Sequence, residues 1–188
     1  WNLLGNGKNS VIPVSGILGN SNLVGSVWKW MAANGAWAFY SPGLADGGVA
    51  YAAGKGYLVL QTINPGEGFW VNAKTAFTLQ LPAGAAISAA ALGGALAPAW
   101  NLAATGDSKT PSAFNSALSP IAPNPGVIPA NITSLWAWDN ASTAWYFYAP
   151  NLEANGTLAG YVASKGYLDF ATGGKTLDPG VGFWVNRT

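Results

Sequence analysis

Few residues of this sequence belong to the types that usually carry out catalysis. Histidine and cysteine are both absent from the 188 residues, which excludes thiol nucleophiles, disulfides, imidazole chemistry and the usual structural zinc sites. Glu67 and Glu153 are the carboxylates that a glycosidase would require at a separation of roughly 5 to 9 Å. Nothing in their spacing indicates such a pair, so the sequence predicts neither catalytic residues nor a metal site or cofactor.

One catalytic signature is matched in form only. The segment from Ser26 to Lys29 reads S-x-x-K, the signature of penicillin-recognising enzymes, which requires the start of a helix. Here apolar and polar residues alternate, which predicts a strand, and the companion S-D-N and K-T-G motifs are missing. We therefore treat the match as chance.

Aromatic side chains are the best candidates for binding. Flat Trp and Tyr rings stack on the C–H faces of sugar rings, and neutral Asn side chains would supply hydrogen bonds. Large aromatic residues on one face of a strand are nevertheless core residues first, and we expect this of Trp28, Trp30, Trp70 and their partners in a second copy. Residues that edge a turn before a proline are better candidates, and Tyr146 is expected to be the most exposed. The predicted ligand-binding residues are Trp37, Tyr40, Trp145, Tyr146 and Tyr148.

The sequence motifs that contain these aromatic residues occur twice along the chain. All ten tryptophans fall into five matched pairs, and the motifs around them occur in the same order in both halves. The matched segments are Trp1-Asn2-Leu3 with Trp100-Asn101-Leu102, Val27-Trp28-Lys29-Trp30 with Leu135-Trp136-Ala137-Trp138, Trp37-Ala38-Phe39-Tyr40 with Trp145-Tyr146-Phe147-Tyr148, Lys55-Gly56-Tyr57 with Lys165-Gly166-Tyr167, and Gly68-Phe69-Trp70-Val71-Asn72 with Gly182-Phe183-Trp184-Val185-Asn186. This doubling predicts repeat 1 at 1–82, an Ala- and Gly-rich connector at 83–99, and repeat 2 at 100–188.

Within each copy the hydrophobic period is mostly two, which is the period of β-strands. Two hairpins are predicted, with turns at 32–35 and 139–143, and a further strand is expected at 77–81. Short helices are expected at 44–54, 152–164 and 111–118, the first two ending at Gly56 and Gly166. The predicted fold is mainly β, with two tandem homologous lobes, short helices and internal pseudo-symmetry.

The ordered motifs WNL, WxW, WxFYxP, KGY and GxGFWVN resemble a Trp-rich tandem repeat of secreted and surface-anchored proteins of environmental bacteria. The resemblance covers nearly the whole chain. It implies an extracellular bacterial module that is often joined to other domains, and it implies no catalytic residue.

The charges exclude several classes of partner. Only 8 % of residues are charged and the net charge is +1, so the sequence has no basic stripe for nucleic acid and no cluster for anionic lipid. Its most apolar segment, 85–100, is shorter than the ~20 residues that a membrane-spanning helix needs. The ionisable residues retained in both copies are Lys55 and Lys165, whose expected place at a helix end favours a dipole interaction over reactivity.

The sequence therefore predicts a non-enzymatic protein that is secreted or displayed on the cell surface. Because no signal-peptide pattern is present, an exported form would be a mature or excised chain. The first functional hypothesis is a binding or adhesion module that recognises a glycan or another surface polymer through its aromatic residues. The alternative is a structural subunit of a filament, sheath or surface layer that self-associates.

Overall fold

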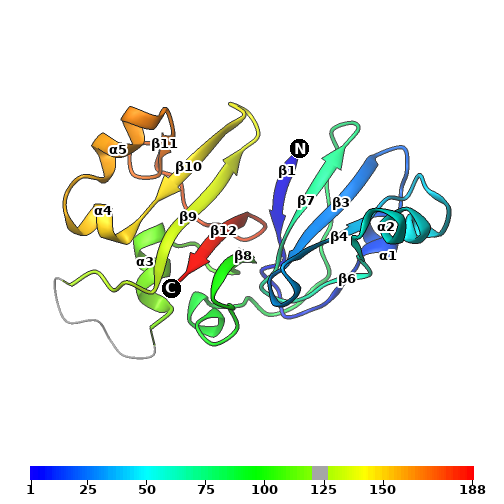
Figure 1. Cartoon of the computed structure of the whole chain (residues 1–188), viewed down its shortest axis with the longest axis horizontal. Helices are drawn as coiled ribbons and strands as arrows, with labels where there is room; N and C mark the ends of the chain where they lie inside the picture. The colour runs from blue at the N-terminus through cyan, green and yellow to red at the C-terminus, as the bar shows by residue number, and fades with distance from the viewer. Residues whose placement is uncertain (120–126) are drawn as a thin grey trace.

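Two similar five-stranded sheets dominate the protein (Figure 1), whose structure is a computed structural model that describes residues 1–119 and 127–188. The first sheet has the order β1 (Asn2–Gly5), β7 (Gly68–Ala73), β3 (Val24–Met31), β4 (Ala36–Tyr40) and β5 (Leu58–Val59). The second has the corresponding order β8 (Ala99–Ala104), β12 (Gly182–Arg187), β9 (Ile132–Asp139), β10 (Ala144–Tyr148) and β11 (Leu168–Asp169). In both sheets the last strand is parallel to its neighbour and the other pairings are antiparallel. The predicted mainly β fold is confirmed. We call the part of the chain at 1–82 the first lobe and the part at 100–188 the second lobe.

Both predicted hairpins are present. In the first, β3 and β4 are joined by a 3-10 turn, η1 (Ala32–Asn34), which ends at Gly35 with a φ of +57°. Glycine adopts this left-handed conformation without a steric penalty. In the second, β9 and β10 are joined through Thr143, which also has a positive φ, and the Asp139 side chain accepts a hydrogen bond from the Ser142 N–H. Each hairpin brings two tryptophans opposite each other, Trp30 with Trp37 and Trp138 with Trp145.

The helices are short and lie mainly at the outer ends of the molecule, where Figure 1 shows α1 and α2 at one end and α4 and α5 at the other. Helices α2 and α5 end at glycines with left-handed φ values, Gly56 and Gly166, and have Lys55 and Lys165 in their last turns, as predicted. The segment predicted as a single helix at 152–164 is divided in two at Gly156, which also has a positive φ. The helices are α1 (Val14–Leu18), α2 (Val49–Lys55), α3 (Pro111–Ala117), α4 (Pro150–Ala154) and α5 (Leu158–Lys165), and the further 3-10 segments are η2 (Ala45–Gly47) and η3 (Ala89–Leu92).

One predicted strand is wrong. Residues 77–81 have no strand pairing, although Phe77, Leu79 and Leu81 pack against the core of the first lobe. Their alternation therefore reflects the burial of every second side chain in an extended segment that forms no ladder. The small pair that the sequence did not indicate is β2 (Ile12–Pro13) with β6 (Thr62–Ile63).

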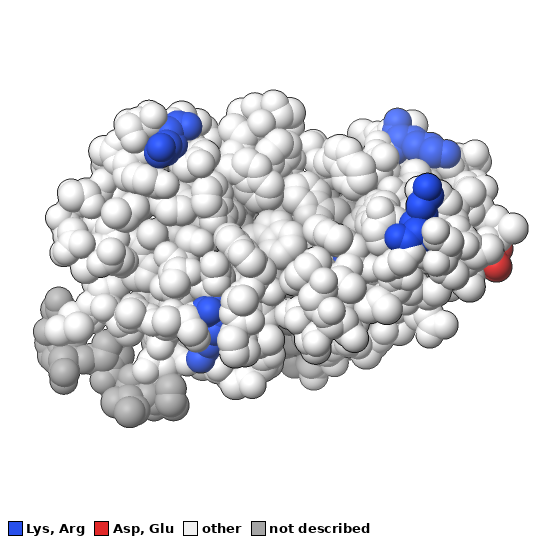
Figure 2. Space-filling model, in the orientation of Figure 1, with Lys and Arg blue, Asp and Glu red and all other residues white. Residues whose placement is uncertain are grey.

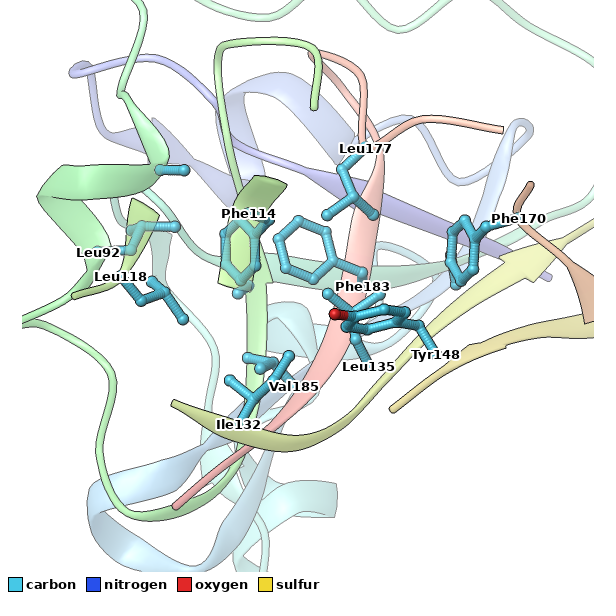
Figure 3. Close-up of a cluster of buried hydrophobic side chains, with 13 residues drawn as sticks. Leu92, Phe114, Leu118, Ile132, Leu135, Tyr148, Phe170, Leu177, Phe183 and Val185 are labelled. Atoms are coloured by element: carbon cyan, nitrogen blue, oxygen red, sulfur yellow. The ribbon is translucent and has the colours of Figure 1, made fainter. Parts of the chain in front are cut away.

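Each lobe has its own hydrophobic core. The first is centred on Val27, Ile63, Phe69 and Val71. The second surrounds Phe114 and Phe183, whose rings meet edge to face with centroids 4.9 Å apart (Figure 3). Figure 3 also shows side chains from α3, β9 and β12 converging on this point. An aromatic residue from α3 thus closes the core of a sheet that would otherwise have one apolar face open.

The two lobes meet along the edge strands β1 and β8. Leu4 forms a bridge with Val181, and Glu67 forms one with Ala103. The backbone N–H of Gly5 donates to the Gly180 carbonyl at 2.9 Å, and that of Ala104 donates to the Gly66 carbonyl at 2.9 Å. These contacts run in both directions between the lobes.

Glycine is required at this junction because the backbones approach closely. A Cβ atom at Gly5 would lie 2.5 Å from the Val181 carbonyl oxygen, and one at Gly182 would overlap the Leu4 carbonyl oxygen. The lobes are therefore in direct backbone contact.

The connector at 83–99 is packed against both lobes. On the first lobe the Asn9 N–H donates to the Ala85 carbonyl at 2.9 Å, and Ile87 donates to Gly7 at 2.9 Å. On the second lobe Ala89 and Leu92 are buried in the core. The connector therefore makes contacts with both lobes.

Candidate functional site

The tryptophans lie on the face of each sheet that is turned away from the core. On β3, Val27 and Lys29 are buried, whereas Trp28 and Trp30 lie on the opposite face and are half-buried. Successive residues of a strand point to opposite sides, so the predicted shared face of the two tryptophans is correct. The two large cores lie on the opposite faces, so the expectation that this face is the main core is wrong. A smaller buried cluster of Phe147, Ala149 and Val162, against which Trp136 packs, does lie on it. All ten tryptophans belong to the described residues and none is fully buried, and Trp1 and Trp100 remain 53 % and 41 % exposed.

These rings form two matched networks, and each crosses between the lobes. The first contains Trp28, Trp30, Trp37, Trp100 and Trp184, and the second contains Trp136, Trp138, Trp145, Trp1 and Trp70. Within the first lobe, Trp30 and Trp37 meet edge to face with centroids 5.5 Å apart. Across the lobes, Trp37 lies 5.8 Å from Trp184, and the matched residues Trp145 and Trp70 lie 5.9 Å apart. Edge-to-face pairs at these distances are stabilising beyond the area they bury, by about 0.5–1.5 kcal/mol each. The two networks therefore hold the tryptophan faces of the two sheets against each other.

Two indole hydrogen bonds lock this arrangement. The Trp30 Nε1–H donates to the Trp100 carbonyl at 3.0 Å, and the Trp138 Nε1–H donates to the Trp1 carbonyl at 3.2 Å. In the repeat pairing Trp30 corresponds to Trp138, and Trp100 corresponds to Trp1. Each lobe therefore donates to the first strand of the other lobe in the same way.

The result is a groove with two aromatic pockets of about 580 and 550 Å³, within the range of roughly 300–1,000 Å³ that is typical of small-ligand sites. Among the described residues, every side chain that lines them is tryptophan or tyrosine, and both pockets include Trp37 and Trp145. The repeat pairing carries one set of lining residues onto the other. The first pocket is lined by Trp30, Trp37, Trp100, Trp136, Trp145, Tyr167 and Trp184, and the second by Trp138, Trp145, Trp1, Trp28, Trp37, Tyr57 and Trp70. We call this surface the tryptophan groove.

Charges lie away from this groove. Figure 2 shows that lysine and arginine side chains are few on the face it draws. One ion pair involves Lys29, which lies between Trp28 and Trp30 in the sequence. Its Nζ atom is 2.6 Å from Glu67 Oε2, and the Lys29 side chain is only 3 % exposed. It lies on the core face of β3, opposite to Ser26, which confirms that the S-x-x-K match is a strand.

The five predicted ligand-binding residues separate into two groups. Trp37 and Trp145 line both pockets. Tyr40 and Tyr148 point the other way and are 9 % and 3 % exposed in the lobe cores, so a ligand on the surface does not reach them. Tyr146 is half-buried against Phe170, with ring centroids 5.1 Å apart, and is not the exposed aromatic residue that we expected.

Two groove residues, Tyr57 and Tyr167, were missed as site residues. Both follow the retained Lys-Gly pair, so their recurrence was a usable signal. Their rings contact Trp28 and Trp136 edge to face, each with centroids 5.0 Å apart. The glycine after each helix turns the chain back so that the following tyrosine contacts Trp28 or Trp136.

The two candidate acidic residues, Glu67 and Glu153, lie in different lobes and have different partners. Glu67 pairs with Lys29, and Glu153 accepts hydrogen bonds from the Tyr148 hydroxyl at 2.6 Å and the Ser112 hydroxyl at 2.9 Å. Burial, together with the bond to the Glu153 carboxylate, raises the pKa of Tyr148 well above its ordinary value of 10.0. Among the described residues there is no group of acidic side chains arranged to hold a metal ion.

Within the described residues, no helix is both long enough and apolar enough to cross a membrane. No protein-family model, curated protein or solved structure matches the chain.

Proposed function

We propose that the protein is a non-catalytic binding module, secreted or displayed on the cell surface, which holds a neutral carbohydrate chain in the tryptophan groove. The observation that carries this proposal is the pair of matched aromatic pockets joined through Trp37 and Trp145. Concave pockets lined by aromatic side chains are the usual form of a small-ligand site. Uncharged rings favour a neutral ligand that presents C–H faces.

The proposal includes an approximate two-fold symmetry between the lobes. The reciprocal bonds from Trp30 to Trp100 and from Trp138 to Trp1 support it, as does the equal strand order of the two sheets. Such symmetry gives two equivalent subsites in one groove, which suits a ligand made of repeating units.

A glycan array tests this proposal with the wild-type protein and three variants. Trp37→Ala and Trp145→Ala remove rings that both pockets share, so we expect at least a tenfold loss of the array signal. Tyr51→Ala is the control because Tyr51 is 44 % exposed and lines neither pocket. A clean negative for the wild-type protein on a wide array, or equal loss in all three variants, contradicts the proposal.

A second candidate function is that of a structural subunit that self-associates. It is favoured by the exposed edge strand β5, where Leu58 and Val59 are 38 % and 40 % exposed, beside Val49 at 41 %. Exposed apolar edges are templates for pairing with another chain. Light scattering over a wide concentration range tests it, with Leu58→Lys as the variant expected to abolish assembly. A protein that stays monomeric at high concentration excludes this second function.

A further inference from the structure

The tryptophan groove offers hydrogen-bond donors and almost no acceptors. Four of the ten indole N–H groups are already used inside the protein, those of Trp28, Trp30, Trp136 and Trp138. Among the described residues, Trp37, Trp70, Trp145 and Trp184 have no partner for theirs, and none of these nitrogens is sealed from solvent. Indole donates and does not accept. The shared residues at the centre of the groove are therefore donors that a ligand can use.

Among the described residues, side-chain acceptors in these walls are restricted to one phenol in each pocket. Tyr57 lines the second pocket and Tyr167 lines the first, and every other lining side chain is tryptophan. A ligand hydroxyl that enters the groove gives up a water acceptor and finds an indole face in its place. Leaving a donor unpaired is the expensive part of burying a polar group. A sugar with free hydroxyls at every position is therefore poorly matched to these walls.

We propose that the groove selects acetylated glycans, in which acetamide or acetate ester groups replace hydroxyls. This inference rests on the proposed carbohydrate-binding function and specifies its ligand. Each acetyl group brings a carbonyl oxygen that accepts from an indole N–H, and a methyl group that packs on a ring. Replacing a hydroxyl by an acetate ester also removes a donor that the walls would leave unpaired.

The doubling of the groove extends this match along a chain. Because Trp37 and Trp145 belong to both pockets, a ligand that follows the groove meets an accessible indole donor from each lobe at its centre. Trp184 and Trp70 then follow in the first and the second pocket. A polymer with acetyl groups at regular intervals meets the same donor twice. The phenols of Tyr57 and Tyr167 can accept from hydroxyl or amide N–H groups that such a polymer retains. An oligoproline chain has no internal N–H and would leave these phenols unused.

Titration calorimetry with two hexasaccharides of the same β-1,4 backbone tests the inference. Chitohexaose has an acetamide at C2 of every sugar, whereas cellohexaose has a hydroxyl there. Each of these groups has one donor hydrogen, so the pair of ligands tests the added carbonyl acceptor and methyl group. We expect chitohexaose to bind at least tenfold more tightly. Equal binding, or tighter binding of cellohexaose, overturns the inference and leaves the carbohydrate function standing. If neither hexaose binds, the inference is also overturned, and the glycan array decides the broader function separately.

Two Trp→Phe variants separate the N–H group from the ring. Trp184→Phe removes an accessible donor, while Trp136→Phe removes one that is already bonded to Ser134. Both residues line the first pocket alone, so both variants lose the same ring area in the same pocket. We expect Trp184→Phe to weaken chitohexaose binding about tenfold more than Trp136→Phe does, with no such difference for cellohexaose. Equal effects of the two variants on chitohexaose contradict the role of the N–H. Decaproline that binds more tightly than chitohexaose overturns the inference in favour of a peptide ligand.

Discussion

The buried ion pair of the first lobe offers a sharp test of how the two copies diverged. Lys29 and Glu67 correspond to Ala137 and Val181 in the second lobe, so both charges are replaced there by apolar residues. The Lys29 Nζ atom lies 2.6 Å from Glu67 Oε2 and 3.2 Å from the Thr62 carbonyl oxygen. The Lys29 side chain is 3 % exposed and that of Glu67 is 30 % exposed.

The geometry sets the expected order of the effects. Glu67→Val leaves a buried ammonium with a single carbonyl partner, and it should destabilise the protein by about 3 kcal/mol, the lower end for breaking a buried pair. Lys29→Ala should cost about 2 kcal/mol, because the remaining carboxylate keeps water and the Asn64 N–H at 2.5 Å. The double variant reproduces the residue types of the second lobe and should cost only about 2 kcal/mol, since no charge is left unpaired.

Urea unfolding followed by circular dichroism measures the free energy of unfolding for the four proteins of this double-mutant cycle. We expect a coupling energy of about 3 kcal/mol between the two positions, within the range seen for contacting residues. A coupling below about 0.5 kcal/mol would mean that the two effects simply add. That result would refute the reasoning that the unpaired charge, and not the lost packing, dominates the cost.

The remaining predictions concern the junction, the second core and acid stability. Gly182→Ala should destabilise the protein by about 2 kcal/mol, because its Cβ would overlap the Leu4 carbonyl oxygen. Gly160→Ala within α5, where the space around the Cβ is open, should instead stabilise it by about 0.5–1 kcal/mol in the same unfolding assay. Changes of the same sign in the free energy of unfolding would contradict this prediction. Tyr148→Phe should cost about 1 kcal/mol by removing the hydrogen bond to Glu153, more than Tyr40→Phe, and the reverse order in thermal unfolding would exclude the bond as the cause. For Asp107, partial burial acts to raise the pKa, but hydrogen bonds from Thr105 and Lys109 and the Lys109 charge outweigh it and hold the pKa below the ordinary 3.8. A carboxylate whose pKa is lower in the folded state stabilises the protein at pH values above its unfolded pKa, and this stabilisation is lost as the pH falls through the folded pKa. The stability should therefore decline below about pH 4, and Asp107→Asn should make that decline less steep. An unchanged acid profile would rule out this carboxylate as a cause.

The doubling, the hairpins and most helix positions could be predicted because they depend on local signals. Alternation places Trp28 and Trp30 on one face, and Gly56 and Gly166 end helices wherever the chain turns back. The face that forms the core could not be predicted, because both faces of β3 are suitable for burial. Tryptophan is the larger apolar residue, which favours burial of its face. Lys29 predicts that the opposite face is exposed, unless its ion pair with Glu67 is known.

The errors at the candidate site have a different origin. The turn before a proline predicts Trp37, Tyr40, Trp145 and Tyr148 at the surface together, but along a strand Tyr40 and Tyr148 point to the side opposite Trp37 and Trp145, so one surface cannot present all four. The strand predicted at 77–81 failed for a different reason. Its apolar side chains pack on the core as expected, but strand pairing depends on a free neighbouring edge, which a single segment does not reveal. Contacts between the lobes, such as Trp37 with Trp184, depend on how two complete sheets meet and leave no local signal.

The closeness of the indole rings has an optical consequence. Neighbouring centroids lie about 5 to 6 Å apart along a path that crosses from Trp30 through Trp37 to Trp184, and chromophores at such distances share their excited states. Light absorbed by either lobe should therefore be emitted from a few low-energy rings in the groove, and the ultraviolet dichroism should contain a strong exciton couplet. The tryptophan fluorescence and the exciton couplet should therefore change when the two lobes separate or a ligand binds, so both can be followed without an added dye.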